Sequence, residues 1–414
     1  MSYESFMDKL LDGIEVEWLS LAEVGELVRG SGLPKKDFAE FGVPAIHYGQ
    51  IYTYYGLATT STVSFVSPET AEKLKKVDTG DVVITNTSEN LEDVGKALVY
   101  LGERQAVTGG HATIFKPSES LLGKYFAYFT QTSVFASAKR KYAKGAKVID
   151  LSAKDMAKIQ IPIPCPENQE KSLEIQAEII RILDAFTELT TELTTELSAR
   201  NKQYSYYRGR LLSFDEEEVE WKVLDDVCSS ISAGGDVPKK FVKGQNHPTD
   251  ELPYPIFANA VGEKGLYGYT DGYKIESDAV TISARGAKVG YHTVREGKFT
   301  PIIRLIVLIA DKKLISTKYL NYILYMTQID GTKGGIPQLT VPKVKKISIP
   351  IPYPNDSEKS LEEQARIVSI LDKFDVLTSS ISEGLPREIE LRQKQYEYYR
   401  DLLFSFPKNE EVKD

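Results

Sequence analysis

IQIPIPCPENQEKSLEIQAEIIRILDAF, residues 159–186, returns as ISIPIPYPNDSEKSLEEQARIVSILDKF, residues 347–374, with 18 of 28 positions identical at a constant offset of 188. A chain that carries one unit twice is expected to behave as a covalent dimer with internal pseudo-two-fold symmetry. The alternate prolines of each IPIP segment exclude a helix there and predict an extended segment. The sequence that follows each IPIP segment is helical in pattern.

The repeated frame encloses two stretches that barely match. EVEW opens each unit (Glu15–Trp18 and Glu218–Trp221), and QYxYYR lies near its end (Gln203–Arg208 and Gln395–Arg400). The offset of QYxYYR is 192, so the second unit has four more residues before it. These boundaries predict five parts: an N-terminal helical piece at 1–18, a first insert at 19–158, a central repeated helical spacer at 159–221, a second insert at 222–346 and a C-terminal repeated helical spacer at 347–414.

Bulk composition describes a large chain whose charge is unevenly distributed. The net charge of −8 argues against a nucleic-acid partner. However, residues 19–158 carry 17 basic and 15 acidic side chains, and residues 222–346 carry 18 and 12, so both inserts are basic. The two cysteines form no framework, and no apolar stretch is long enough to span a bilayer. We therefore expect a cytoplasmic protein without membrane contact, whose inserts can bind DNA.

Apolar residues at spacings of three and four predict a seam along each repeated helix. The two seams are expected to pack on each other as an antiparallel coiled coil. Residues 382–386, SEGLP, should interrupt the second helix. The tandem TELT, TELT and TELS of Thr187–Ser198 are either a spacing ruler or an ordinary amphipathic helix. The seam consists of Ile179, Ile182, Phe186, Leu189 and Leu193 in the first copy and Ile367, Ile370, Phe374, Leu377 and Ile381 in the second.

Each insert reads as a mixed α/β globule. Short apolar runs predict strands at residues 81–86, 112–115, 279–283, 289–293 and 302–310, and helices at residues 123–138 and 316–327. The overall class is therefore α+β, with two globular inserts separated by two long antiparallel helices.

The QYxYYR segments place tyrosines and arginines on one helical surface. They serve either to bind a protein partner, where these residue types are enriched, or to close the end of the helical bundle. The residues are Tyr204, Tyr207 and Arg208, and in the second copy Tyr396, Tyr399 and Arg400.

Basic and glycine-bearing loops in the inserts are candidates for DNA contact. Lysine and arginine neutralise phosphates, and arginine or glutamine can bond base edges. The 188 offset sets residues 145–151 opposite residues 333–339, a glycine-bearing loop before each IPIP segment. The candidates are Lys35, Lys36, Lys139, Arg140, Lys141, Lys144, Lys147, Lys239, Lys240, Arg285, Lys288, Thr332, Lys333 and Gln338.

Sequence motifs for chemistry are missing. The chain has no GxxxxGK[ST] phosphate loop, and its four histidines stand apart from any cysteine or HExxH partner. We expect no metal, no catalytic residue and no bound cofactor. An enzyme, such as a nuclease using Asp81, Asp150 or Asp278, and a stand-alone DNA-binding regulator are the alternatives.

Two unlike inserts between repeated IPIPxP, ExQAxIxxILDxF and QYxYYRxxLLxF segments resemble the DNA-specificity subunits of type I restriction-modification systems. The resemblance spans the whole chain. It implies that each insert is a target recognition domain for one half of an asymmetric bipartite site on double-stranded DNA. It also implies that the helices set the spacing and bind two modification subunits. Restriction subunits would join through these, with S-adenosylmethionine, ATP and Mg²⁺ held by the partners.

Overall fold

Each IPIP segment is a strand that pairs antiparallel with an EVEW segment. In the computed structural model, β14 (Gln160–Pro164) pairs with β1 (Val16–Ser20), and β25 (Ser348–Pro352) pairs with β15 (Val219–Val223). The isoleucines of both IPIP strands are buried. The expected extended segments are thus confirmed. The expectation of a helical piece at 1–18 is wrong for residues 16–18, because this segment supplies the partner strand that the IPIP backbone needs.

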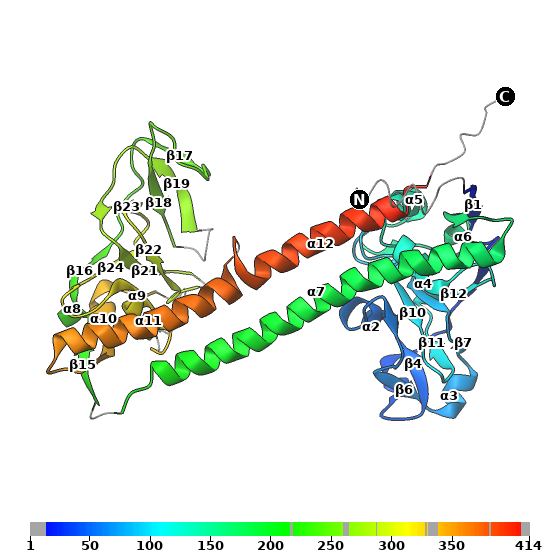
Figure 1. Cartoon of the computed structure of the whole chain (residues 1–414), viewed down its shortest axis with the longest axis horizontal. Helices are drawn as coiled ribbons and strands as arrows, with labels where there is room; N and C mark the ends of the chain where they lie inside the picture. The colour runs from blue at the N-terminus through cyan, green and yellow to red at the C-terminus, as the bar shows by residue number, and fades with distance from the viewer. Residues whose placement is uncertain are drawn as a thin grey trace. The chain divides into compact units, whose positions relative to one another are not determined.

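The structure describes residues 14–215, 218–259, 265–286, 288–327, 329, 338–380 and 382–406. The chain divides into two units. Unit 1 contains Met1–Thr194 and Glu388–Asp414, and unit 2 contains Thr195–Arg387. Each unit therefore holds one insert together with segments of both repeated helical spacers (Figure 1).

The two inserts share one topology although their sequences differ. The first sheet of unit 1 has the strand order β2-β12-β8-β10-β5, and unit 2 repeats its first four places as β16-β24-β21-β22. The second sheets, β3-β6-β4-β11-β7 and β17-β19-β18-β23-β20, also correspond, each with one parallel pair. The first-sheet strands are β2 (Gly25–Arg29), β12 (Ala112–Pro117), β8 (Val82–Thr85), β10 (Ala97–Tyr100), β5 (Ala58–Thr59), β16 (Cys228–Ala233), β24 (Ile306–Ala310), β21 (Ala279–Ile282) and β22 (His292–Arg295).

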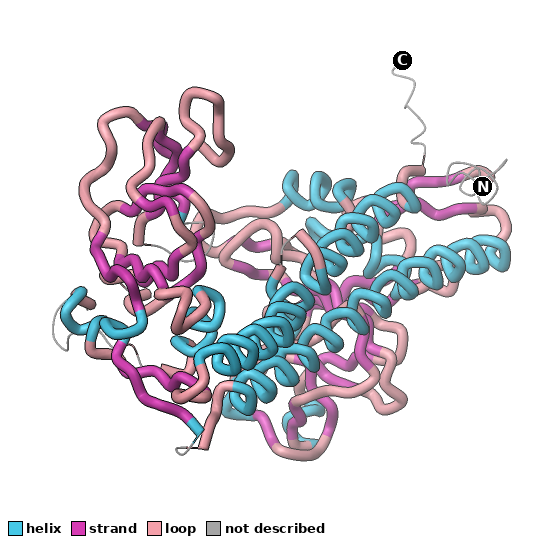
Figure 2. The backbone as a smooth tube through the Cα atoms, turned by 60° about the vertical axis from the view of Figure 1, so that its left-hand side comes forward, coloured by secondary structure: helices cyan, strands magenta, loops and turns pink. Residues whose placement is uncertain are grey.

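The second-sheet strands are short. They are β3 (Phe38–Ala39), β6 (Ser64–Val66), β4 (Val43–Ile46), β11 (Ala106–Thr108), β7 (Lys75–Val77), β17 (Phe241–Lys243), β19 (Leu266–Thr270), β18 (Tyr254–Phe257), β23 (Lys298–Pro301) and β20 (Ile275–Glu276). A small extra pair in unit 1 joins β9 (Thr87–Ser88) to β13 (Ile149–Asp150). Figure 2 shows most strands in the inserts, whereas the repeated spacers are mainly helical after the IPIP strand with which each begins.

The remaining helices of the inserts are mostly short. Unit 1 has the 3₁₀ helix η1 (Lys35–Asp37) and the helices α2 (Tyr48–Thr53), α3 (Pro68–Glu72), α4 (Gly123–Phe129), α5 (Ser133–Tyr142) and α6 (Ala153–Met156), and unit 2 has α8 (Leu224–Val227), α9 (Thr317–Leu324) and α10 (Val341–Lys345).

The strands expected at residues 81–86, 112–115 and 279–283 are confirmed, and α9 confirms the second helix. Three expectations need correction. Residues 123–138 are two helices, because Thr132 caps a new one through its side chain. Residues 289–291 are a turn, and residues 302–305 are a loop before β24.

A duplicated clamp joins each insert to its helix. The motif KYxxY occurs on α4 (Lys124, Tyr125, Tyr128) and on α9 (Lys318, Tyr319, Tyr322), and the comparison of the inserts by sequence overlooked it. In unit 1, Tyr128 donates to Asp184 at 2.5 Å and Lys124 pairs with the same carboxylate at 2.7 Å. In unit 2, Tyr322 and Lys318 bind Asp372, both at 2.7 Å. Burial, followed by the adjacent carboxylate, raises the pKa of both phenols, which keeps them as donors.

A buried glutamine completes each clamp. The Gln176 side chain accepts from the Leu122 backbone N–H and donates to the Ser120 carbonyl, both at 2.9 Å. Gln364 makes the same two bonds to Ser316 and Leu314, also at 2.9 Å. Both glutamines have no exposed surface. The glutamine side chain of the repeated helix therefore holds the start of α4 or α9 through main-chain groups, which do not depend on the sequence of the insert.

The long helices are α7 (Gln169–Leu211), α11 (Ser357–Ser379) and α12 (Gly384–Leu403). The expected interruption between α11 and α12 is present, and Gly384 has a φ of +74°. In unit 1, Phe186 of α7 stacks on Tyr399 of α12 with centroids 5.4 Å apart. In unit 2, Phe374 of α11 stacks on Tyr204 of α7 at 5.9 Å. The contact that lies later in α7 lies earlier in the α11–α12 segment, so the two run antiparallel.

At their starts, the two seams do not pack on each other as expected. Ile179 and Leu183 lie in the core of unit 1, whereas Ile367 and Leu371 lie in the core of unit 2. Each seam begins under its own insert and then meets the tyrosines of the other copy's QYxYYR tail. Because both antiparallel helices continue beyond their seams, the seam of each helix faces the QYxYYR segment of the other. Ile381 lies outside the described residues.

Prediction from the clamp. Gln176→Ala removes the partner of a part-buried N–H and of a part-buried carbonyl, so it should destabilise unit 1 by about 1–3 kcal/mol. Gln364→Ala should do the same to unit 2. Calorimetric melting of each variant measures this, with Glu188→Ala on the exposed face of α7 as the control. A melting temperature equal to that of the control would show that the clamp contributes little.

Candidate nucleic-acid interface

The two unlike inserts share one loop motif. Residues 30–36 read GSGLPKK and residues 234–240 read GGDVPKK, which is GxxxPKK at a constant offset of 204. Both loops directly follow the corresponding strands β2 and β16. The candidates Lys35, Lys36, Lys239 and Lys240 are therefore two copies of one feature.

Each GxxxPKK loop lies against a second loop that precedes β12 or β24. Gly30 donates to the Ala112 carbonyl at 2.9 Å, and Gly234 donates to the Leu305 carbonyl at 2.7 Å. Isolated parallel bridges follow, Ser31 with Gly109 and Gly235 with Ile302. A Cβ on Gly30 would lie 2.0 Å from the Gly109 carbonyl oxygen, so glycine is required for this approach. We call residues 108–111 and 301–304 the facing loops.

In the first insert the two loops line a cleft of about 460 Å³. Burial, and then electrostatic repulsion from Lys35 and His111, lowers the pKa of His47 in its wall. His111 is exposed, its ring centroid lies 4.8 Å from that of Tyr48, and its Nδ1 lies 3.2 Å from Thr87 Oγ1. The cleft is thus basic and aromatic, which suits a polyanion with flat bases.

In the second insert the facing loop is strained and basic. Ile303 and Arg304 have φ values of +53° and +59°, a region unfavourable for branched side chains. The Asn259 side chain holds this turn by donating to the Ile303 carbonyl and by accepting from Ala284 N–H at 2.8 Å. Arg304 occupies the place of His111 and is exposed, and it forms no ion pair within the described residues. A methyl group at Gly235 would lie 3.0 Å from Lys274 Nζ, so another cation adjoins the loop.

Comparison with known proteins identifies the family. The model for the type I restriction modification DNA specificity domain matches residues 14–201 and again residues 216–391. The chain is 35% identical to the type I restriction enzyme EcoR124I/EcoR124II specificity subunit of Escherichia coli, over all of both chains. It is 32% identical to the EcoprrI specificity subunit of the same organism, with 92% of this chain and 93% of that one covered.

The chain belongs to the type I specificity subunit family. A solved S subunit of a type I restriction-modification system from M. genitalium has the same fold, with a TM-score of 0.57, 15% identity and coverage of 96% of this chain and 98% of that one. Each matched range runs from an EVEW strand through one insert and its IPIP strand into the following helix. The two inserts of this type I specificity subunit are therefore its two DNA specificity domains.

The other candidates for DNA contact fall into three groups. Arg140, Lys141, Lys144 and Lys147 are exposed around the end of α5 and the loop after it, and Arg285 and Lys288 are exposed in the second domain. Gln338 forms a bridge with Arg285. Thr332 and Lys333 lie outside the described residues.

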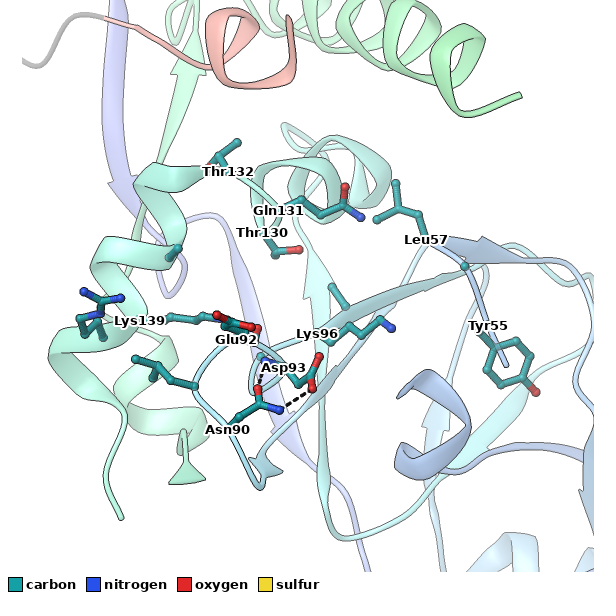
Figure 3. Close-up of a pocket in the computed structure, with 16 residues that line it drawn as sticks. Tyr55, Leu57, Asn90, Glu92, Asp93, Lys96, Thr130, Gln131, Thr132 and Lys139 are labelled. Atoms are coloured by element: carbon teal, nitrogen blue, oxygen red, sulfur yellow. Dashed lines mark hydrogen bonds between the residues drawn. The ribbon is translucent and has the colours of Figure 1, made fainter. Parts of the chain in front are cut away.

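Lys139 differs from its neighbours because it is buried. Its Nζ donates to the carbonyls of Glu92 and Val94 at 2.7 and 2.8 Å, in the wall of a cavity of about 730 Å³ (Figure 3). Burial lowers the pKa of this lysine. We leave Lys139 out of the proposed DNA contacts, since its ammonium is already bound inside the protein.

The QYxYYR tyrosines mainly make contacts within the units. Tyr204 is buried, which raises its pKa to about 12, and Arg208 lies over the rings of Tyr204 and Tyr325, 5.2 Å from each centroid. Tyr396 donates to Gln131 at 2.5 Å, and Arg400 lies over its ring. These contacts support the second reading, in which the tyrosines close the bundle. Tyr206 and Tyr398, which the sequence analysis did not single out, are 60% and 64% exposed.

The described residues show neither a metal-binding cluster nor a membrane-spanning helix. They contain no group of three or more His, Cys, Asp or Glu side chains placed to hold a metal ion. No described helix has the length and apolarity needed to cross a membrane.

Prediction from Lys139. Lys139→Ala should lower stability by about 1–3 kcal/mol, because one buried and one part-buried carbonyl lose their donor. The slope of DNA affinity against salt should remain that of the wild type. Calorimetry and a gel-shift salt titration measure both, with Arg140→Ala as the exposed neighbour for comparison. A flatter salt slope without loss of stability would return Lys139 to the DNA contacts.

Proposed function

We propose that this chain recognises an asymmetric, bipartite DNA site, with each specificity domain reading one half. One observation carries the proposal: a single chain holds two domains of the same topology whose exposed loops differ. A symmetric dimer presents two equal surfaces and reads a palindrome. Two unequal surfaces on a duplicated frame should read two different half-sites, with an unread gap between them.

The repeated helices suggest which protein partners the chain binds. Two modification subunits would bind the repeated helices, one for each copy. Tyr206 and Tyr398 occupy equivalent exposed positions, and Tyr is enriched in protein interfaces. Tyr207, with 38% of its surface exposed, could join them, whereas Tyr204 is buried. Restriction subunits would join through the modification subunits.

Chemistry is assigned to the partners. S-adenosylmethionine would bind the modification subunits, and ATP and Mg²⁺ the restriction subunits. The chain itself would be non-catalytic and would position DNA so that a partner can flip and methylate an adenine. A stand-alone regulator would instead bind its site tightly without partners, which footprinting of the purified subunit would detect.

The TELT repeats are the proposed ruler. They lie inside the uninterrupted helix α7, and the division between unit 1 and unit 2 falls within them, after Thr194. Leu189, Leu193 and Leu197 are half-buried, while the glutamates are exposed. The hydroxyls of Thr191 and Thr194 donate to main-chain carbonyls four residues earlier, both at 2.8 Å. The repeats are thus an amphipathic helix that also connects the two units, so the two readings are compatible.

Prediction from the ruler. Deletion of Thr191–Thr194 removes about 6 Å of helix, close to one 3.6-residue turn, so the apolar face stays nearly aligned. About two base-pair steps of B-DNA span the same length. The gap should shorten by one or two base pairs and both half-sites should stay unchanged. The interruption between α11 and α12 gives the second connection a place to adjust.

Methylome sequencing of cells that carry the variant with its modification partner measures the gap. Replacement of the same four residues by AELA keeps the helix length and serves as the control, for which the gap should not change. Full activity with an unaltered gap in the deletion variant would refute the ruler.

Prediction from the basic loop. Lys144→Ala should weaken DNA binding on all sequences and reduce the salt slope by about one, because one phosphate contact is lost. Lys333→Ala should act in the same way in the second domain. Lys158→Ala is the control, since Lys158 shares the Asp155 carboxylate with Lys144, at 2.9 and 3.2 Å. An unchanged slope, or the same change in the control, would remove Lys144 from the interface.

A further inference from the structure

In each specificity domain the GxxxPKK loop lies beside the facing loop, and only the first of these two loops is alike in both domains. The GxxxPKK loop is the same in both, with Lys35 and Lys239 at equivalent positions. The facing loop is in the same place in both but has different residues, His111 in one and Arg304 in the other. This contrast separates two kinds of DNA contact.

A residue that is identical in both domains cannot distinguish two different half-sites. It can only bind what the half-sites share, and on a duplex that is the sugar-phosphate backbone. Lys35, Lys36 and Lys239 suit this role because they are exposed and form no ion pair within the described ranges. Lys240 is only loosely engaged, 3.7 Å from Asp271.

A residue at an equivalent place that differs between the domains can read sequence. Arg304 projects from a turn in which two successive non-glycine residues have positive φ. Such strain persists where surrounding contacts enforce it, and it concentrates at functional sites. Here Asn259 enforces it through its two bonds to the Ile303 carbonyl and the Ala284 N–H. The fold thus holds, at a defined exposed position, a guanidinium that forms no ion pair with any residue the structure describes.

We propose, on the basis of the proposed function, that the GxxxPKK loops grip the phosphates of both half-sites and that the facing loops read bases, Arg304 in one half-site and His111 in the other. The guanidinium bonds the O6 and N7 edge of a guanine in the major groove, since its two donors match these two acceptors. His111 contacts its base from the aromatic wall that it forms with Tyr48. Each loop pair is then one reading unit.

The experiment uses the full chain expressed with its modification partner, and methylome sequencing reports the recognition sequence. Arg304→Ala should remove the requirement for one guanine in one half-site, with discrimination at that base falling about tenfold to a hundredfold. The other half-site should stay as it was. His111→Ala should change only the half-site that Arg304→Ala leaves intact.

Two further variants keep the test independent of folding. Arg304→Lys retains the charge and the flexible stem but lacks the two-pronged geometry, so the guanine requirement should relax while overall affinity is largely kept. Lys239→Ala should lower affinity on every sequence and reduce the salt slope by about one, with the recognition sequence unchanged. Calorimetry confirms that each variant is folded.

The outcomes distinguish a failure of the proposed function from a failure of the roles assigned to the two loops. If the wild-type complex methylates no bipartite site, the proposed function fails. If it does so, but both Arg304 variants keep the wild-type recognition sequence, the base-reading role of the facing loop is refuted. If Lys239→Ala changes the recognition sequence, the phosphate role of the GxxxPKK loop is refuted.

Discussion

The buried glutamine of each repeated helix is the contact on which the rest of this molecule depends. Gln176 and Gln364 bind a main-chain N–H and a main-chain carbonyl at the start of α4 and α9, and Asp184 and Asp372 bind the KYxxY side chains that follow. A buried amide without partners is costly, so the glutamine tolerates few other arrangements. Two domains of different sequence are thereby attached to two copies of one helix in the same way.

This attachment explains how a duplicated frame can carry different functions. The clamp uses backbone groups and a few side chains at the base of each insert, so exposed loops elsewhere are free to differ. The sheets behind those loops keep the same strand order in both domains. As a result, the GxxxPKK loop and its facing loop occur at corresponding places, and a change in the facing loop alters chemistry without altering position.

The helices close each unit with aromatic contacts that are also duplicated. Phe186 meets Tyr399, and Phe374 meets Tyr204, in antiparallel order. At the end of α12, Leu403 and Phe404 enter the core of unit 1, where Phe404 packs on Tyr125 and Phe129. The last described segment of the chain thus belongs to the same unit as the first.

The repeated IPIP and ExQA segments were sufficient to predict the duplicated frame, the extended proline segments, the long helices and the family, because each is a local pattern with a fixed spacing. Such local patterns could not predict which residues the seams contact, because these contacts depend on how far one antiparallel helix is shifted along the other. The sequence also could not predict that Lys139 is buried, because the cations that follow it, Arg140 and Lys141, are exposed. GxxxPKK could have been found by aligning the inserts at offset 204. That His111 and Arg304 correspond emerged only from the strand pairing, because it is hydrogen bonding between distant segments that places them at the same edge of equivalent sheets.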